Sequence, residues 1–476
     1  MGKKNLPFWL LTLSVFTALI LPVLVRDGMF LDGLLYSVLS RNLAEGKGSF
    51  WYPHLSQTYF NAFHEHPPLV FGIQSLFFRV FGDHIWVERF YSFLTAILTG
   101  YLVTLLWKKI FKPKPELAGL SWLPFFLWII IPLTYWSYRN NMLENTLGIF
   151  TLAAVYLLIT GLSSNRKMLF YIVISACLIL AGFLSKGFVA LFPLVVIGLY
   201  WLIFKNSSFY EMLFYALVLL ILPALLLGLV CLLDKQAYPG LVQYFNAQLI
   251  PSLKGQRAVT ERYYITLRLL KELSPVIILT ALGLLFCRLK KTDLSQIKSF
   301  SRWIFLFFGI GFSASLPMMI SPKQLGFYLV PSFPYFSIGF AIILAPGLNE
   351  LIRKINPKGK TFTTFTFISL ILLIIIIAIS ISQAGKIGRD RQKLEDIYTI
   401  GKIVPGDSVI SICPSMGSDW SLHGYFARYF YISLDPGNGE HKYFLTDGSC
   451  DPAVKGNYTR IQLPADLYTL YKKTEE

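Results

Sequence analysis

Long apolar runs recur along most of this chain. A helix needs about 20 apolar residues to cross the ~30 Å hydrocarbon core of a bilayer. Runs near that length lie at residues 7–25, 85–107, 118–136, 143–162, 168–184, 188–204, 212–233, 273–287, 303–320, 327–345 and 362–382, with a half-length run at 67–81. Only 14% of the residues are charged, against about 25% in soluble domains. The sequence therefore predicts a polytopic all-α membrane protein with about eleven to thirteen transmembrane helices.

The distribution of basic residues predicts the direction of these helices. Lys and Arg gather at the cytoplasmic ends of membrane helices. They occupy alternate connections between the runs, at 3–4, 108–114, 166–167, 205, 288–291 and 353–360. We therefore expect a cytoplasmic N-terminus and an outer C-terminal tail. The net charge of +17 follows from this pattern, and anionic lipid headgroups accommodate it. No basic patch lies on a soluble domain, which argues against nucleic-acid binding.

The composition changes after Ser382. Residues 385–476 are polar, and their short alternating runs are separated by turns rich in Gly, Pro and Asp. This pattern is typical of a small domain that contains strands. We predict a membrane domain over 1–384, with long outer loops at 26–84 and 234–272, and a soluble extracytoplasmic α/β domain over 385–476.

Two cysteines, Cys413 and Cys450, lie in this outer tail. A compartment outside the cytoplasm permits a disulfide. Spacing along the sequence does not set the Cα separation that a disulfide requires, however. The sequence alone leaves a bridge and two free thiols as open alternatives.

The first outer loop concentrates ionisable residues at the membrane boundary, where they are costly to desolvate. Asp32 opens a stretch with apolar residues at helical spacing. It can cap that helix, or it can act as a general base or metal ligand. Glu65 and His66 come just before Pro67 and Pro68, which favour the start of a helix. These two residues can bind an anionic group or a metal, or lie among headgroups.

Two later positions place a charge within an apolar run. Glu144 lies near the start of one run, an expensive place for an unpaired carboxylate. Arg139 is about a turn away, so we expect a structural ion pair between the two. Lys186 interrupts another run, where it can extend to the headgroups or bind a phosphate group.

The remaining candidates lie in the second half of the chain. Arg257, in the second long outer loop, can contact an anionic lipid. Lys323 and Tyr328 come just before a run that contains Pro331 and Pro334. These prolines can kink the helix so that backbone groups line a cavity.

The order of these features carries more weight than any one of them. An acidic residue after the first run is followed by HPPL, ERFYSF, RxxMxE, LSKG and YLVPSFP. This order resembles the GT-C type of membrane glycosyltransferase. The resemblance is to bacterial members of the dolichyl-phosphate-mannose-protein mannosyltransferase superfamily, a group that includes the lipid A aminoarabinose transferase. It covers about residues 1–345, and the tail resembles the variable soluble domain of many members.

The resemblance implies roles for individual residues. Asp32 corresponds to the family's functional first-loop carboxylate, and Lys186 corresponds to its phosphate-binding lysine. The other matched positions are Tyr36, Arg89, Glu144 and Tyr328.

Two positions depart from the family pattern. Gly33 replaces a second acid beside Asp32, which puts a two-carboxylate or metal role of that loop in doubt. His66 replaces a lysine before the prolines, so a constant positive charge becomes dependent on pH.

The implied activity is the transfer of a sugar from a polyprenyl-phosphate-linked donor to an acceptor at the outer face of a bacterial cytoplasmic membrane. The acceptor can be lipid A, a glycan or a protein. Asp32 would activate the acceptor hydroxyl. The residues expected to bind the donor phosphate are Lys186, His66, Arg257 and Tyr328. The supporting residues are Tyr36, Glu65, Arg89, Arg139, Glu144 and Lys323. No cofactor is required by the resemblance, and a divalent metal is compatible with it.

Two other classes share parts of this pattern. A flippase or transporter of lipid-linked sugars also places polar residues at kinked helices, but it should show inverted repeats and charges near mid-membrane. A polysaccharide ligase or polymerase would use the same kind of donor and differ mainly in its acceptor. The acids of this chain gather at one face, which favours the transferase.

Overall fold

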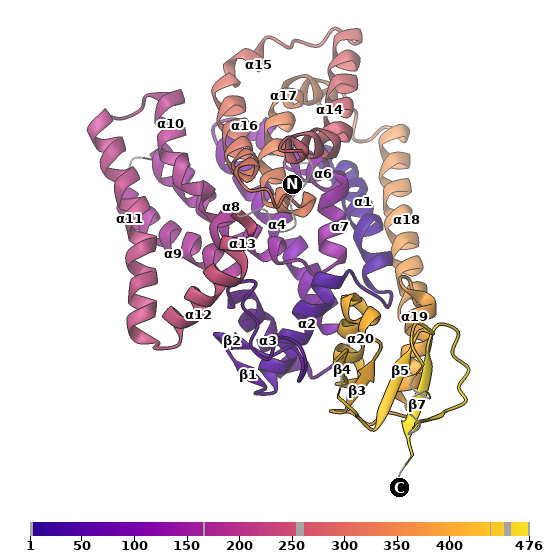
Figure 1. Ribbon diagram of the computed structural model, residues 1–476. Coiled ribbons are helices and arrows are strands. Elements are labelled where there is room, and N and C mark those ends of the chain that lie inside the picture. The colour runs from indigo at the N-terminus through magenta and orange to yellow at the C-terminus, as the bar shows by residue number, and fades with distance from the viewer. Residues whose placement is uncertain (1–2, 165–166, 254–260, 438, 452–457, 475–476) are drawn as a thin grey trace. The chain divides into compact units, whose positions relative to one another are not determined.

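The computed structural model describes residues 3–164, 167–253, 261–437, 439–451 and 458–474. The chain divides into two compact units, whose elements are labelled in Figure 1. The first unit holds Met1–Pro22, Glu65–Pro67 and Ser92–Ser382, and the second holds Val23–His64, Pro68–Tyr91 and Gln383–Glu476. The second unit therefore combines the tail with most of the first loop. The functional division at residue 384 stays a prediction.

Helices make up most of the described chain. The longer ones are α1 (Leu6–Leu24), α2 (Leu31–Ala44), α3 (Leu69–Phe81), α4 (Val87–Ile110), α6 (Trp122–Ile129), α7 (Pro132–Arg139), α8 (Leu143–Ser164), α9 (Met168–Lys186), α10 (Val196–Phe204), α11 (Phe209–Leu233), α12 (Ala237–Tyr244), α14 (Tyr264–Leu289), α16 (Ser301–Ser315), α17 (Phe333–Arg353), α18 (Lys360–Gln383), α19 (Arg391–Gly401) and α20 (Trp420–Phe430). Short α-helices, 3-10 turns and one π turn connect them: η1 (Lys3–Asn5), α5 (Pro115–Ala118), η2 (Gly187–Val195), η3 (Phe245–Leu249), α13 (Ile250–Leu253), α15 (Gln296–Ser299), η4 (Leu316–Ile320), η5 (Gly326–Ser332) and η6 (Pro414–Ser418).

The helices confirm the predicted membrane class. Within the described residues, nine helical segments are long and apolar enough to cross a membrane, or ten if one bent pair counts as a span. Every predicted run overlaps a helix. The number is below eleven because the runs at 168–184 and 188–204 fall in one apolar segment of 37 residues, Met168–Phe204, and because the run at 118–136 forms the bent pair. The half-length run forms α3, which has 13 residues.

Two of these apolar segments are broken near a proline. The bent pair, Pro115–Ile129 and Pro132–Arg139, turns by 78°. Ile131 is extended there, because a residue before proline avoids the helical conformation. The 37-residue segment would be about 55 Å long as a single α-helix, more than a bilayer needs. It is interrupted by η2, which contains Pro193.

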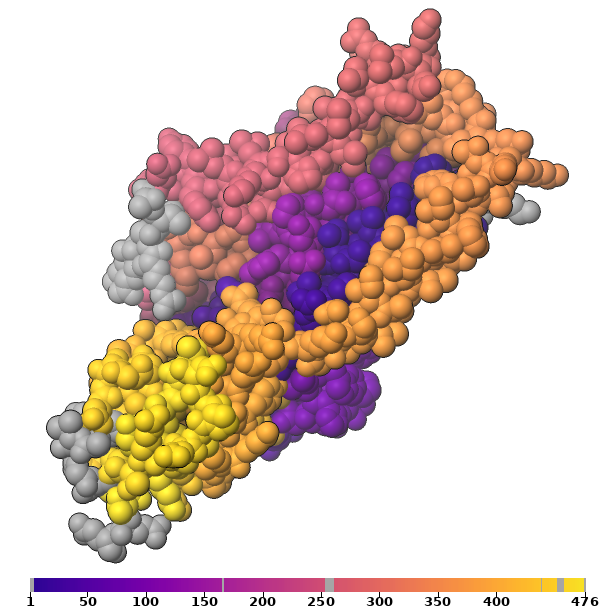
Figure 2. All heavy atoms as spheres, turned by 90° about the vertical axis from the view of Figure 1, so that its right-hand side faces the viewer, coloured from indigo at the N-terminus to yellow at the C-terminus, as the bar shows by residue number. Residues whose placement is uncertain are grey.

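Apolar side chains cover the surface of the membrane helices. In α18, Phe367, Ile368, Ile374 and Ile381 are all more than half exposed. Figure 2 shows this orange helix exposed along its length. In water such a face would be strongly unfavourable, whereas lipid tails solvate it. The face is therefore suited to contact with lipid.

The tail forms the predicted small domain with a sheet. Its strands are β3 (Val409–Ile412), β4 (Ser433–Asp435), β5 (Tyr443–Thr446), β6 (Tyr458–Arg460) and β7 (Thr469–Lys473), in the order β4-β3-β5-β7-β6. β3 runs parallel to both β4 and β5, while β7 is antiparallel to β5 and β6. α20 connects β3 to β4, as parallel strands require a crossover. A separate hairpin pairs β1 (Gly48–Ser49) with β2 (Tyr52–Pro53) in the first loop.

The core of this domain draws on the first loop as well as on the tail. Met29 and Leu34 belong to the same buried cluster as Ile410 and Leu434 of the sheet. The tail therefore buries part of its apolar surface against the segment that carries Asp32. A disulfide joins Cys413, which follows β3, to Cys450, with their Cα atoms 5.9 Å apart. Of the two alternatives that the sequence left open, the bridge is the one formed.

Candidate functional site

The first unit contains a cavity of about 230 Å³. Its wall carries both polar and apolar side chains. The lining residues are His66, Lys186, Phe188, Val189, Tyr244, Gln248, Leu249, Ser252, Pro317, Met318, Ser321, Lys323 and Tyr328. Four residues proposed from the sequence thus meet here from distant parts of the chain: His66, Lys186, Lys323 and Tyr328.

Lys186 is the last residue of α9 and is 5% exposed. Its ammonium group forms an ion pair with the Glu144 carboxylate. It also lies 5.1 Å from the centre of the Phe327 ring and 5.0 Å from that of Tyr328. Aromatic faces attract cations at such distances. The lysine is therefore held inside the protein, and the alternative that it extends to the headgroups is wrong.

Glu144 lies in the first turn of α8 and is fully buried. The predicted ion pair between Glu144 and Arg139 is wrong, because Glu144 pairs with Lys186. Arg139 ends α7, donates to the backbone carbonyl of Leu19 and lies over the Tyr135 ring. The chain turns between α7 and α8, so the two residues do not share a helix face.

His66 is half-buried in the cavity wall. Burial and the nearby positive charges of Lys186 and Lys323 hold the pKa of its imidazole well below the ordinary value of 6.5. The ring is therefore neutral at pH 7 while the cavity holds no anion. In place of the lysine that the sequence resemblance implied, this chain has a neutral hydrogen-bonding group.

The segment that carries Lys323 is fixed by a residue that the sequence analysis did not single out. Gln324 is 1% exposed. Its side-chain carbonyl accepts a hydrogen bond from the Ile265 N–H at 2.9 Å, and its amide donates to the carbonyls of Arg262 and Ser321 at 3.1 and 3.2 Å. A buried amide with several partners holds a loop in one conformation. The signal available in the sequence was its place beside Lys323.

Gly187 follows Lys186 and allows the chain to turn at the cavity. Its φ is +74°, a conformation that side chains disfavour. A Cβ atom there would lie 2.0 Å from the Tyr244 hydroxyl. The tight packing of Gly187 on Tyr244 therefore sets the wall of the cavity beside Lys186.

Changing Gly187 to alanine should lower the free energy of unfolding by about 2 kcal/mol or more, because the strained backbone and the clash add. The melting temperature of the purified protein measures this loss. Gly198→Ala in α10 is the matched control, since a Cβ built there meets no described atom within 4 Å apart from its two chain neighbours and the nearby backbone of its own helix. Adding Tyr244→Phe to Gly187→Ala should restore part of the stability. Equal melting temperatures for the two alanine variants would contradict the prediction.

Asp32 lies in the first turn of α2, two residues after the N-cap position, which is Phe30. It is therefore not the cap residue, although a carboxylate in this turn still meets the positive end of the helix dipole. Asp32 is partly exposed. Tyr36, one turn further on, is buried and packs on the Phe71 ring of α3 at 5.7 Å between centres.

Asp27, the other acid near the start of this loop, is buried and hydrogen-bonded. It is 3% exposed. It accepts hydrogen bonds from the hydroxyls of Tyr398 and Tyr429 and from the Gly28 N–H at 2.7 Å. Burial and the Asp27 charge raise the pKa of Tyr398, so this hydroxyl remains a donor. Asp27 therefore joins the first loop to the tail.

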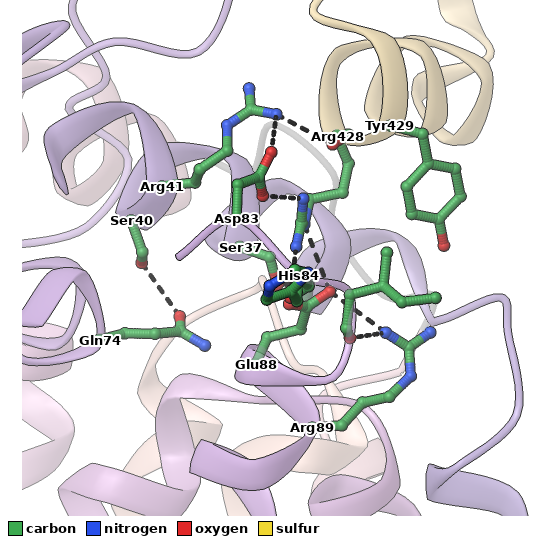
Figure 3. A network of polar contacts seen from close by, with 12 residues as sticks. Ser37, Ser40, Arg41, Gln74, Asp83, His84, Glu88, Arg89, Arg428 and Tyr429 are labelled. Atoms are coloured by element: carbon green, nitrogen blue, oxygen red, sulfur yellow. Dashed lines mark hydrogen bonds and ion pairs between the residues drawn. The ribbon is translucent and has the colours of Figure 1, made fainter. Parts of the chain in front are cut away.

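Arg89, a predicted supporting residue, belongs to the same polar network of the second unit (Figure 3). It donates to the Arg26 carbonyl at 3.0 Å and contacts Glu88 at 3.2 Å and Asp27 at 3.5 Å. It does not line the cavity. Arg89 is thus placed where it supports the first loop.

The other predicted residues have simpler outcomes. Glu65 is half-buried and is not among the described residues that line the cavity. Arg257 lies outside the described residues. Within the described residues, no group of three or more His, Cys, Asp or Glu side chains is placed to hold a metal. The interpretation of Asp32 as a metal ligand therefore lacks partner ligands in this part of the chain.

Comparisons with known proteins place this geometry in context. Residues 65–229 match the family model described as dolichyl-phosphate-mannose-protein mannosyltransferase. A search of curated proteins finds no match.

Solved structures show where the fold recurs. The chain is similar to ArnT from Cupriavidus metallidurans bound to undecaprenyl phosphate, with a TM-score of 0.65, 12% identity and 96% of each chain covered. For ArnT in the apo state the TM-score is 0.63, at 14% identity, covering 96% of this chain and 95% of that chain. The apo oligosaccharyltransferase from Archaeoglobus fulgidus gives 0.53 at 12% identity, covering 91% of this chain and 65% of that chain. The chain has the GT-C fold, and the resemblance predicted from its motifs is confirmed.

Proposed function

We propose that this chain, which has the GT-C fold, transfers a sugar from a polyprenyl-phosphate-linked donor to an acceptor. The observation that carries the proposal is the cavity in which Lys186, Lys323, His66 and Tyr328 meet. These groups can hold a phosphate, and another part of the wall is apolar. A lipid phosphate combines the same two properties in one molecule.

The polar groups suit a phosphate that leaves as an anion. In a direct displacement the bond between the anomeric carbon and the phosphate oxygen breaks, and negative charge develops on that oxygen. Lys186 and Lys323 would stabilise this charge. The Tyr328 hydroxyl and the neutral His66 ring can donate hydrogen bonds. Arg257, from the second outer loop, is proposed as a further cation on sequence grounds.

The apolar part of the wall suits the prenyl chain. Phe188, Val189, Leu249 and Met318 line the cavity beside the polar groups. One of the two ArnT structures that share this fold is described as bound to undecaprenyl phosphate. We therefore propose a polyprenyl phosphate of this class as the lipid carrier for this chain.

Glu144 is proposed to position Lys186 rather than to react. The two form a buried ion pair. An ammonium group has three donors, so Lys186 can keep Glu144 and still bind a phosphate oxygen. The carboxylate thereby holds the lysine in place. Its negative charge also offsets the positive charge of Lys186 in the cavity.

Asp32 is proposed as the general base that accepts a proton from the acceptor hydroxyl. It is partly exposed on an otherwise largely buried helix, as an acid that must meet a substrate should be. We also propose that the reaction takes place at the outer face of a bacterial cytoplasmic membrane. The alternation of basic connections along the sequence supports this orientation.

The proposal is tested by measuring how the affinity for undecaprenyl phosphate depends on pH in the wild type and in a His66 variant. A bound phosphate favours the protonated imidazole, so the affinity contributed by His66 should rise as pH falls from 8 to 5. His66→Lys carries its charge throughout and should bind about tenfold more tightly at pH 8, because it adds one charge-assisted hydrogen bond of about 1.5 kcal/mol. The difference between the two proteins should shrink toward pH 5. Titration with the lipid in detergent measures both affinities.

Comparing the two proteins at each pH cancels the titration of the lipid phosphate itself, since both bind the same ligand. His84→Lys, an exposed position of the second unit, is the matched charge control and should leave the affinity unchanged. If His66→Lys binds like the wild type at every pH, the cavity does not hold the phosphate. Transport of the lipid-linked sugar without its consumption would favour the flippase instead.

A further inference from the structure

Helix α20 of the tail contacts the segment that carries Asp32 at two places, one before Asp32 in the sequence and one after it. Before Asp32, the Tyr425 hydroxyl accepts a hydrogen bond from the Met29 N–H at 3.2 Å and donates to Asp390 at 2.8 Å. Tyr425 is fully buried. Burial and the Asp390 charge raise the pKa of Tyr425, so the phenol stays protonated. The backbone three residues before Asp32 is therefore tied to α20.

After Asp32, the two helices approach closely at a glycine. A Cβ atom on Gly424 would lie 2.8 Å from Leu34 Cδ2 and 3.3 Å from Leu35 Cδ2. Contacts this short leave no room for a larger side chain unless these leucine side chains shift. The start of α2 is therefore packed directly against the backbone of α20.

Two turns further on, a buried arginine fastens the same pair of helices. Arg41 of α2 donates to the backbone carbonyls of Arg428 at 2.9 Å and of Ala427 at 3.0 Å. The last carbonyls of a helix have no partner within it, and a cation is the favourable partner there. Arg41 of α2 thus supplies hydrogen bonds to carbonyls at the end of α20.

The end of α20 is fixed in turn to the segment before α4 and to the first turn of α4 (Figure 3). The Arg428 guanidinium contacts Asp83 at 2.6 Å and Glu88 at 3.0 Å. Its side chain is 2% exposed. Separating the partners of such a buried ion pair is strongly unfavourable. Arg428 therefore stays bound to these two acids. α20 is therefore a rigid support.

Asp32 lies on a different face of α2 from Leu34 and Arg41, which contact α20. At 100° per residue, Asp32 lies on the same side of α2 as Tyr36 and Ser40. These two residues contact Phe71 and Gln74 of α3. Helix α2 is thus held between α20 and α3, and its first turn has little freedom to shift.

We propose that α20 positions Asp32 for catalysis, with Tyr425 and Gly424 as the positioning residues. The tail would then act on the rate of sugar transfer through α2. The proposal rests on the role of Asp32 given above. A displacement of about 1 Å at a reacting group can lower a rate by about a hundredfold. A small loosening of α2 should therefore appear in kcat before it appears in folding.

Tyr425→Phe in the full-length protein tests this positioning role. It removes one hydroxyl and leaves the packed ring in place. We expect kcat to fall about tenfold with the donor KM changed less than twofold, as for a group that acts only in the transition state. Hydrogen exchange at the amides of residues 29–35 should become faster, whereas exchange at Tyr443–Thr446 should not change. Tyr458→Phe is the matched control, because its hydroxyl donates to the His441 carbonyl elsewhere in the same domain.

The two readouts separate this inference from the proposed function. Unchanged exchange at residues 29–35, or an unchanged kcat alongside an inactive Asp32→Asn, would overturn the positioning role. If Asp32→Asn keeps full activity, the proposed base is wrong, and the positioning of a catalytic Asp32 is wrong with it. In that case faster exchange at residues 29–35 would show only that α20 supports the fold.

Discussion

Replacing Asp32 with asparagine is expected to lower kcat for sugar transfer by a factor of about 10² to 10⁴, the usual contribution of a positioned general base. Asparagine keeps the size and hydrogen-bonding shape of the side chain but cannot accept the proton. The donor KM should change little, because Asp32 is proposed to act on the acceptor. The measurement is transfer from a polyprenyl-phosphate-linked sugar that the wild-type protein uses.

The Asp32 experiment needs a control for the loss of one negative charge. Asp407→Asn provides it, since this acid belongs to the same unit and its side chain is 70% exposed. That variant should keep wild-type kcat. Both variants should stay folded, and Asp32→Asn should lower the melting temperature only slightly, because it loses the interaction of its charge with the dipole of α2, worth about 0.3 to 1 kcal/mol. Wild-type kcat in Asp32→Asn would remove this residue from the mechanism.

Lys186→Met is expected to lower both the activity and the stability of the protein. Loss of one group that stabilises a developing anion costs about 10² to 10³ in rate. The change also leaves Glu144 buried without its ion-pair partner, and breaking a buried pair costs about 3 to 5 kcal/mol of stability. Both kcat/KM and the melting temperature should therefore fall.

A double variant separates these two effects. Lys186→Met with Glu144→Gln removes both charges, so most of the stability should return while activity stays low. Glu144→Gln alone should keep the fold and lower kcat/KM less than Lys186→Met does, because the lysine remains but is less firmly held. If the double variant regains activity as well as stability, Lys186 has only a structural role. Melting curves and initial rates on the same preparations decide between these outcomes.

Local sequence patterns predicted the membrane helices well, because the ability of a segment to cross a bilayer depends mainly on its own residues. Chain length and hydrophobicity set whether a run can cross a bilayer, and Pro132 marks where one run bends. The tail was predicted in the same way, from turns and alternating runs. The number of spans shows the limit, since the predicted runs at 168–184 and 188–204 fall in one apolar segment, Met168–Phe204, and hydrophobicity does not say whether adjoining runs cross the membrane separately.

Partners across the chain could not be predicted from local spacing. Arg139 was the nearest cation to Glu144 in the sequence, yet Lys186, 42 residues away, is the one that pairs with it. Arg89 matches a family motif, but it supports the first loop in the second unit. Gln324 shows no pattern in sequence and fixes the loop beside Lys323. Such contacts depend on which helices pack together.

The sequence by itself determined the class of this protein and the residue types available for its chemistry. Hydrophobic length decides membrane insertion segment by segment, and the order of the motifs identified the fold. Only the tertiary structure decided which of those residues meet. It gathers His66, Lys186, Lys323 and Tyr328 around one cavity, and it places Asp32 on a helix held by α20. Close packing and buried ion pairs act over a few ångströms in space, whatever the separation along the chain.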